Sequence, residues 1–155
     1  MLQRVQTIWL FFATAALFCL FLFPYIQVLN ADGTAKALKV TGVYQNMGGQ
    51  VVQTEPFLPL TIATVLVGLL PFVIIFFYQN RKKQIMICYL SILAILGYSF
   101  WLVQTARQVL GNITLQVDNY GIGVILPSLA ILFIILALRG IRNDEKLIKS
   151  VDRLR

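Results

Sequence analysis

Four long apolar runs, separated by short polar segments, dominate the pattern of hydrophobic and polar positions along the chain. They cover about 7–27, 57–78, 84–108 and 120–138. Each holds roughly 20 residues, the length that a helix rising about 1.5 Å per residue needs to cross a hydrocarbon core of about 30 Å. The pattern therefore predicts four membrane-spanning helices.

A short basic segment, 79–83, joins the second and third runs and contains Arg81, Lys82 and Lys83. Lys and Arg beside a span resist transfer across the membrane. These three residues are therefore predicted to determine the topology, and the segment is expected to form an inner loop on the cytoplasmic side.

This orientation assigns a side to every other segment of the chain. Both termini lie inside, 28–56 and 109–119 are outer loops, and 139–155 is a cytoplasmic tail. The expected fold class is an all-α membrane protein, a four-transmembrane-helix bundle with both termini cytoplasmic (N-in/C-in). It forms a single integral membrane domain over residues 1–155.

The outer loops have patterns that are typical of strands. In the first loop, 36–44 and 50–54 are rich in β-branched residues, and the turn residues of 46–49 lie between them, which predicts a β-hairpin. In the second loop, 113–117 alternates strictly between apolar and polar residues. Because a two-stranded ribbon is marginal alone, the two outer loops are predicted to form one small β-sheet above the bundle.

Composition and charge support a membrane protein and change the expected partners. The chain has 155 residues, of which 59% are hydrophobic and 12% charged, and its mean hydropathy is +0.81. In the four-span arrangement the whole formal net charge of +7 lies on the inner side. Such one-sided basic charge is the usual mark of topology, so the expected partner is the lipid bilayer and not nucleic acid.

The residue types that catalysis and ion coupling use are missing from the expected positions. The chain has no histidine, and no charged residue lies in the middle of a predicted span. Cys19 and Cys88 lack the spacing of a redox motif and are expected to be buried free thiols. We therefore expect no enzyme, no cofactor, and no catalytic or metal-binding residue.

Arg107 leaves three readings open at the outer end of the third run. It could recognise an anionic group, extend its side chain to the lipid headgroups, or pair with Asp118 or Glu55.

The charged tail is the predicted contact site for a partner protein. A helix drawn from Ile141 onward gathers apolar residues on one side, and Asn143 is expected to cap it as a new helix. The predicted partner-binding residues are Ile141, Asp144, Glu145, Leu147, Ile148, Val151, Asp152 and Arg153. The alternative is a basic amphipathic helix that lies on the inner leaflet.

The two ends of the chain carry a resemblance to a known family. MLQRVQTIWL at 1–10 and RGIRNDEKLIKSVDRLR at 139–155 resemble the ends of a family of small four-span inner-membrane proteins from Bacteroidota. That family is catalogued as a domain of unknown function. The resemblance implies a bacterial inner (cytoplasmic) membrane location and a multi-pass topology, and it implies no chemistry.

Two functions of different class are compatible with these observations. The first is a non-catalytic accessory or scaffold subunit of a larger inner-membrane complex, with other membrane proteins as partners. The alternative is an oligomeric passive pore or transporter for a lipid or other small molecule, in which Pro71, Pro127 and Gly97 permit mobile spans.

Overall fold

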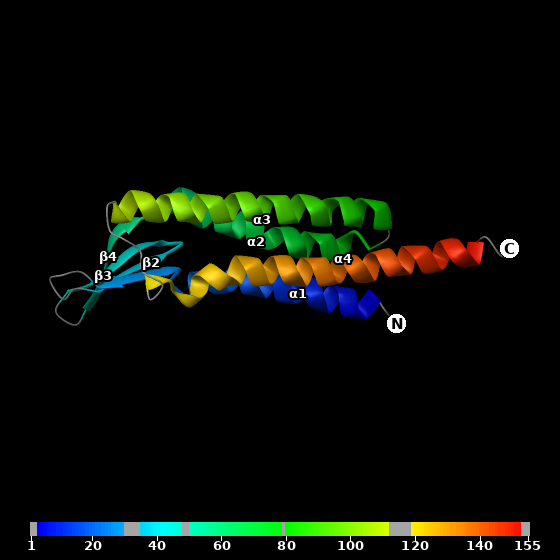
Figure 1. Cartoon of the computed structure of the whole chain (residues 1–155), viewed down its shortest axis with the longest axis horizontal. Helices are drawn as coiled ribbons and strands as arrows, with labels where there is room; N and C mark the ends of the chain where they lie inside the picture. The colour runs from blue at the N-terminus through cyan, green and yellow to red at the C-terminus, as the bar shows by residue number, and fades with distance from the viewer. Residues whose placement is uncertain (1–2, 30–34, 48–49, 79, 112–118, 153–155) are drawn as a thin grey trace.

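The computed structural model describes residues 3–29, 35–47, 50–78, 80–111 and 119–152. Within this part of the chain, long helices lie side by side and a small sheet covers one end of them (Figure 1). The elements in chain order are α1 (Gln3–Phe18), η1 (Cys19–Phe21), β1 (Ile26–Leu29), β2 (Ala35–Lys39), β3 (Gly42–Met47), β4 (Gln50–Pro56), α2 (Leu58–Phe76), α3 (Arg81–Leu110), η3 (Ile122–Val124) and α4 (Ile125–Asp152).

The helices close into a ring, because α1 packs on both α2 and α4, and α3 packs on the same two helices from the other side. The described ends of α1 and α4 lie at one end of the bundle, and the sheet lies at the other (Figure 1). At the end that holds the termini, α4 projects beyond the other helices.

Three helical segments are long and apolar enough to cross a membrane in the described part of the chain: Leu58–Phe76, Arg81–Leu110 and Ile122–Lys146. The first apolar run is different, because its apolar helix, Val5–Phe21, is shorter than a usual span. The predicted span 7–27 is therefore wrong at its outer end, where Ile26–Leu29 forms β1 instead. Pro24 has no N–H to continue the helix, and the N–H of Tyr25 donates to the carbonyl of Leu38 in the sheet.

The sheet is antiparallel, with the strand order β1-β2-β3-β4. The predicted hairpin around 48–49 is confirmed by the pairing of β3 with β4. The expected single strand 36–44 is wrong, because the chain turns after β2 and β3 runs back along it. Leu38, Val40 and Val43 are all buried, and a straight strand could not point all three to one face, since side chains alternate along it.

All the strands that the structure describes come from the first predicted outer loop and the segment just before it. The predicted strand 113–117 lies outside the described residues. Just beyond it, Tyr120 forms an isolated antiparallel bridge with Ile26 of β1, so the chain that leads into α4 does reach the first strand.

Two helix boundaries differ from the sequence predictions. α3 begins at Arg81, so the basic residues form its first turn and the predicted inner loop 79–83 is shorter than expected. α4 is one continuous helix through Asp152, so Asn143 does not cap a new helix. No proline interrupts the residues between Leu138 and Asn143, and Gly140 lies inside the helix, so the chain has no strong reason to stop there.

Candidate functional site at the end that holds the termini

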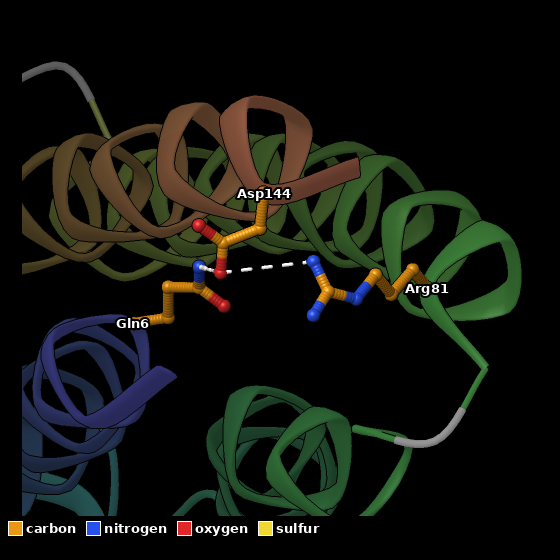
Figure 2. A network of polar contacts seen from close by, with 3 residues as sticks. All are labelled: Gln6, Arg81 and Asp144. Carbon is orange, nitrogen blue, oxygen red and sulfur yellow. Dashed lines mark hydrogen bonds and ion pairs between the residues drawn. The ribbon is translucent and has the colours of Figure 1, made fainter. Parts of the chain in front are cut away.

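A buried polar cluster joins three helices at the end of the bundle that holds the termini. Figure 2 shows Gln6 of α1 and Arg81 of α3 approaching one carboxylate oxygen of Asp144 on α4. The amide Nε2 of Gln6 donates to Oδ2 of Asp144 at 2.6 Å. Nη1 of Arg81 lies 3.7 Å from the same oxygen and forms an ion pair with it.

Burial makes these contacts important for stability. Asp144 and Gln6 are each only 7% exposed, and the Arg81 side chain is 23% exposed. A buried carboxylate loses its hydration, so it needs a counter-charge and hydrogen-bond donors to remain ionised. Gln6 supplies a donor and Arg81 supplies the charge, so each of these three helices contributes one part of the cluster.

The start of α3 adds positive potential around the same carboxylate. Lys82 and Lys83 follow Arg81 in the first turn of α3, and no acidic residue lies in that turn. A helix N-terminus is already the positive end of the helix dipole, so three cations there are electrostatically unfavourable. Asp144 offsets this potential from the neighbouring helix.

Gly140 allows α1 to approach α4 closely one helical turn before Asp144. A Cβ atom at this position would lie 2.9 Å from Cγ of Gln6, which is closer than such atoms approach in proteins. Any larger residue would therefore press on the side chain that donates to Asp144.

Further polar contacts tie α3 to its other neighbours near this cluster. Gln84 of α3 is buried, and its Nε2 lies 3.4 Å from the carbonyl of Ile74 near the end of α2. On the opposite side, Arg142 of α4 donates to the hydroxyl of Tyr89 on α3. The guanidinium carbon of Arg142 also lies 5.4 Å from the centroid of the Tyr89 ring. All four long helices are thus connected at this end.

The predicted partner-binding residues lie partly among the described side chains and partly outside them. Ile141 is 1% exposed and Asp144 is buried in the cluster, so both side chains contact the protein's own helices. Glu145 is half-buried. The backbone of α4 continues through Leu147, Ile148, Val151 and Asp152, but their side chains and the whole of Arg153 lie outside the described residues.

The predicted topology residues also occupy different environments. Arg81 is mostly withdrawn into the cluster, whereas Lys82 and Lys83 are exposed. Arg81 therefore has a structural contact that sequence reasoning did not predict. Gln6 was missed altogether as a functional residue.

The spacing of buried residues holds the signal that could have found the cluster. On α4, Ala130, Ile134, Ala137 and Ile141 are buried at alternating intervals of four and three. Asp144 occupies the next place in this series. On α1 and the η1 turn that follows it, the series Leu20, Leu17, Ala13 and Leu10 leads by the same intervals to Gln6. Extending each apolar stripe by one step would have predicted that Gln6 and Asp144 both face the interface between α1 and α4.

The residues of the cluster are suited to holding helices together. It contains one carboxylate, to which a carboxamide donates a hydrogen bond and with which a guanidinium forms an ion pair. In the part of the chain that the structure describes, no group of three or more His, Cys, Asp or Glu side chains is placed to hold a metal ion. Cys88 is a buried free thiol, as predicted, and Cys19 is a half-buried one.

Comparison with known proteins assigns the chain to a family. No curated protein and no solved structure matches the chain. One family matches residues 2–154, which is nearly the whole chain, and its description is Domain of unknown function (DUF4293). The expectation of such a family from the two ends of the sequence is confirmed at this level. The chain therefore belongs to the DUF4293 family.

Proposed function

We propose that this protein is a non-catalytic accessory or scaffold subunit of a larger complex in a bacterial inner membrane. The observation that carries the proposal is the projecting end of α4, which is one continuous helix clamped to the bundle at Asp144. A helix held at a fixed angle is a suitable platform for a partner, because binding then costs little conformational entropy.

The proposed membrane placement has four spans, with the ends of the chain in the cytoplasm. Besides the three long segments, the 17-residue helix Val5–Phe21 would rise about 26 Å, which a slightly thinned bilayer accommodates. The sheet would lie outside the hydrocarbon, since open strand edges are not stable in lipid. The proposed Bacteroidota origin rests on the resemblance of the two ends of the sequence.

Charge supports the proposed orientation. The basic residues at the end that holds the termini include Arg81, Lys82 and Lys83 of α3 and Arg139, Arg142 and Lys146 of α4. The sheet end has Lys36, Lys39 and Arg107 with the exposed Glu55 among the described residues. Lys and Arg favour the cytoplasmic side of a membrane, so the termini and the α2–α3 connection would face the cytoplasm.

The length of α4 supports a contact site beyond the membrane surface. Its 28 residues rise about 42 Å, whereas a hydrocarbon core is about 30 Å thick. Because Ile141 and Asp144 are buried, the proposed contact site begins beyond them. It uses the apolar positions Leu147, Ile148 and Val151 of the projecting part, which fall on one side of a helix by their spacing.

The test is purification of the protein with its partners from its own membranes in mild detergent. We expect a stoichiometric hetero-complex, which is lost when residues 147–155 are removed. This truncation keeps Asp144 and its contacts, so the bundle should remain folded. Val151→Asp should also release the partner. Ser150→Asp is the matched control, because it adds the same charge about 100° away around the helix.

Two results would contradict the scaffold proposal. One is a truncated protein that retains the same partners at the same stoichiometry. The other is a homo-oligomer without partners that conducts ions or passes a lipid or small molecule in reconstituted vesicles, which would support the pore or transporter instead.

A further inference from the structure

We propose that a groove between α3 and α4, next to the sheet, binds one anionic glycerophospholipid. Its phosphate would contact Arg107, and part of one acyl chain would fill the groove. This inference goes beyond the proposed scaffold function and rests on the proposed placement in the membrane, but on no partner protein.

The groove is a cavity of about 310 Å³ with mainly apolar walls. Leu102 and Ala106 of α3 and Pro127 of α4 are buried in its walls, and Ile26 of β1 also lines it. Its volume is at the lower end of the range for sites that hold small molecules, about 300–1,000 Å³. It is therefore large enough for part of a lipid chain and too small for a whole lipid.

The mouth of the groove is continuous with the apolar outer surface of the helices. Val103 of α3 and Val124 of η3 line the groove and are exposed. In the proposed membrane placement, this opening faces the acyl chains of the adjacent leaflet. An acyl chain could enter sideways without crossing a polar barrier.

Arg107 supplies a positive charge at the headgroup end of the groove. It lines the groove, lies in the last turn of α3 and is exposed. In the described part of the chain it forms no ion pair, and in particular none with Glu55; Asp118 lies outside the described residues. A guanidinium at headgroup depth suits a phosphate, because its paired N–H groups match two phosphate oxygens.

Tyr25 provides a second polar group that lacks a partner. Its side chain is 3% exposed and lines the groove, and its hydroxyl is buried without a hydrogen bond among the described residues. A buried hydroxyl that donates to nothing is unfavourable. Because this hydroxyl has almost no solvent-accessible surface, it lies behind the wall of the groove, and the proposed lipid contact rests on Arg107 and the apolar walls.

The test uses the purified full-length protein and measures by native mass spectrometry which lipids it retains. Probes are phosphatidylglycerol, which is anionic, and phosphatidylcholine, which is zwitterionic with no net charge, both with the same acyl chains. We expect one retained lipid per chain and a preference for phosphatidylglycerol of at least about fivefold.

Two pairs of variants separate the headgroup contact from the chain contact. Arg107→Gln should remove most of the preference for phosphatidylglycerol, whereas Lys39→Gln, which removes the same charge from the sheet, should keep it. Val103→Trp should block the groove and lower retention of both lipids. Val65→Trp, on the exposed face of α2, should not lower it.

Equal retention of the two lipids by the unmodified protein would overturn the proposal, as would unchanged retention after Val103→Trp. Preference that survives Arg107→Gln would also overturn it. None of these results tests the proposed membrane placement. That placement is tested separately by labelling from the two sides of the membrane.

Discussion

Asp144 lies in an environment that differs from what a carboxylate ordinarily prefers. It is buried on a helix whose inward-facing stripe is otherwise apolar, and its stability depends on two residues from distant parts of the sequence. Breaking a buried pair by removing one partner is more costly than forming the pair is favourable, because the remaining group is left desolvated. Removing one member of the cluster is therefore expected to destabilise the protein by more than the complete cluster stabilises it.

Asp144→Asn is expected to destabilise the protein. The amide keeps the shape of the carboxylate and can still accept from Gln6, but it removes the counter-charge of Arg81. We expect a loss of about 1–3 kcal/mol in the free energy of unfolding. Thermal unfolding in detergent would measure it as a lower Tm.

The control for this prediction is Glu55→Gln, which neutralises an exposed acid on β4 and should change stability by less than about 0.5 kcal/mol. Adding Arg81→Gln to Asp144→Asn should restore part of the loss, because no unpaired charge then remains. An Asp144→Asn protein as stable as the unmodified one would show that the ion pair contributes nothing.

At the scale of elements, the sequence predicted what local pattern determines and missed what packing determines. Apolar runs long enough to span were visible for α2, α3 and α4, and the glycines at 48–49 revealed the β3–β4 hairpin. β1 was hidden, because its residues are as apolar as the helix before them. Only the pairing with β2, a contact between separate segments, decides their conformation.

The candidate site was only half visible for the same reason. Arg81 and Asp144 were singled out for topology and for partner binding, but nothing local indicated that they meet. Asn143 favoured a new helix start by residue type. The apolar stripe that runs through Ala137 and Ile141 to Asp144 kept α4 continuous instead, since breaking it would have removed Ile141 from the core.

A close backbone contact joins the end of the first helical segment to the start of the last. The N–H groups of Gly121 and Gly123 donate to the carbonyls of Tyr25 and Pro24 at 3.0 and 3.1 Å. A Cβ atom at Gly121 would lie 2.2 Å from the carbonyl oxygen of Pro24, so only glycine fits at this distance. This contact fixes the residues just before β1 against the start of η3, and one of them, Tyr25, also lines the groove between α3 and α4.

Gly121→Ala should therefore separate these two segments and lower the free energy of unfolding by about 1–3 kcal/mol. The matched control is Gly97→Ala on α3, where an added Cβ meets no atom within 4 Å. That change should be neutral or stabilise by up to about 1 kcal/mol, since alanine favours helix over glycine. Chemical or thermal unfolding of the two variants side by side gives the comparison, and equal stabilities would contradict the close-contact interpretation.

At the scale of the whole molecule, the two ends of the bundle differ in structure. One end is covered by a sheet, and α4 projects at the other end (Figure 1). The groove between α3 and α4 lies next to the sheet, and the polar cluster lies at the end that holds the termini. The proposed orientation places the sheet outside the cell membrane and the cluster at its cytoplasmic surface.

Labelling with a membrane-impermeant thiol reagent tests this orientation. The cells used have a permeabilised outer membrane and an intact inner membrane. In a protein with Cys19→Ala and Cys88→Ala, a cysteine introduced by Gln50→Cys on β4 should react from outside. One introduced by Lys82→Cys on α3 should react only after the inner membrane is permeabilised. Both positions are exposed, so access and not burial decides the result. The reverse pattern would overturn the orientation.

The hydrogen bond between Gln6 and Asp144 has a consequence for synthesis of the protein. Its partners are separated by 138 positions, and the first and last helices pack on one another to close the ring. During translation, α1 and α3 emerge long before the residue that pairs with both of them. A polypeptide released before Asp144 would keep Gln6 and Arg81 without their acceptor, so the cluster forms only after most of α4 has been synthesised.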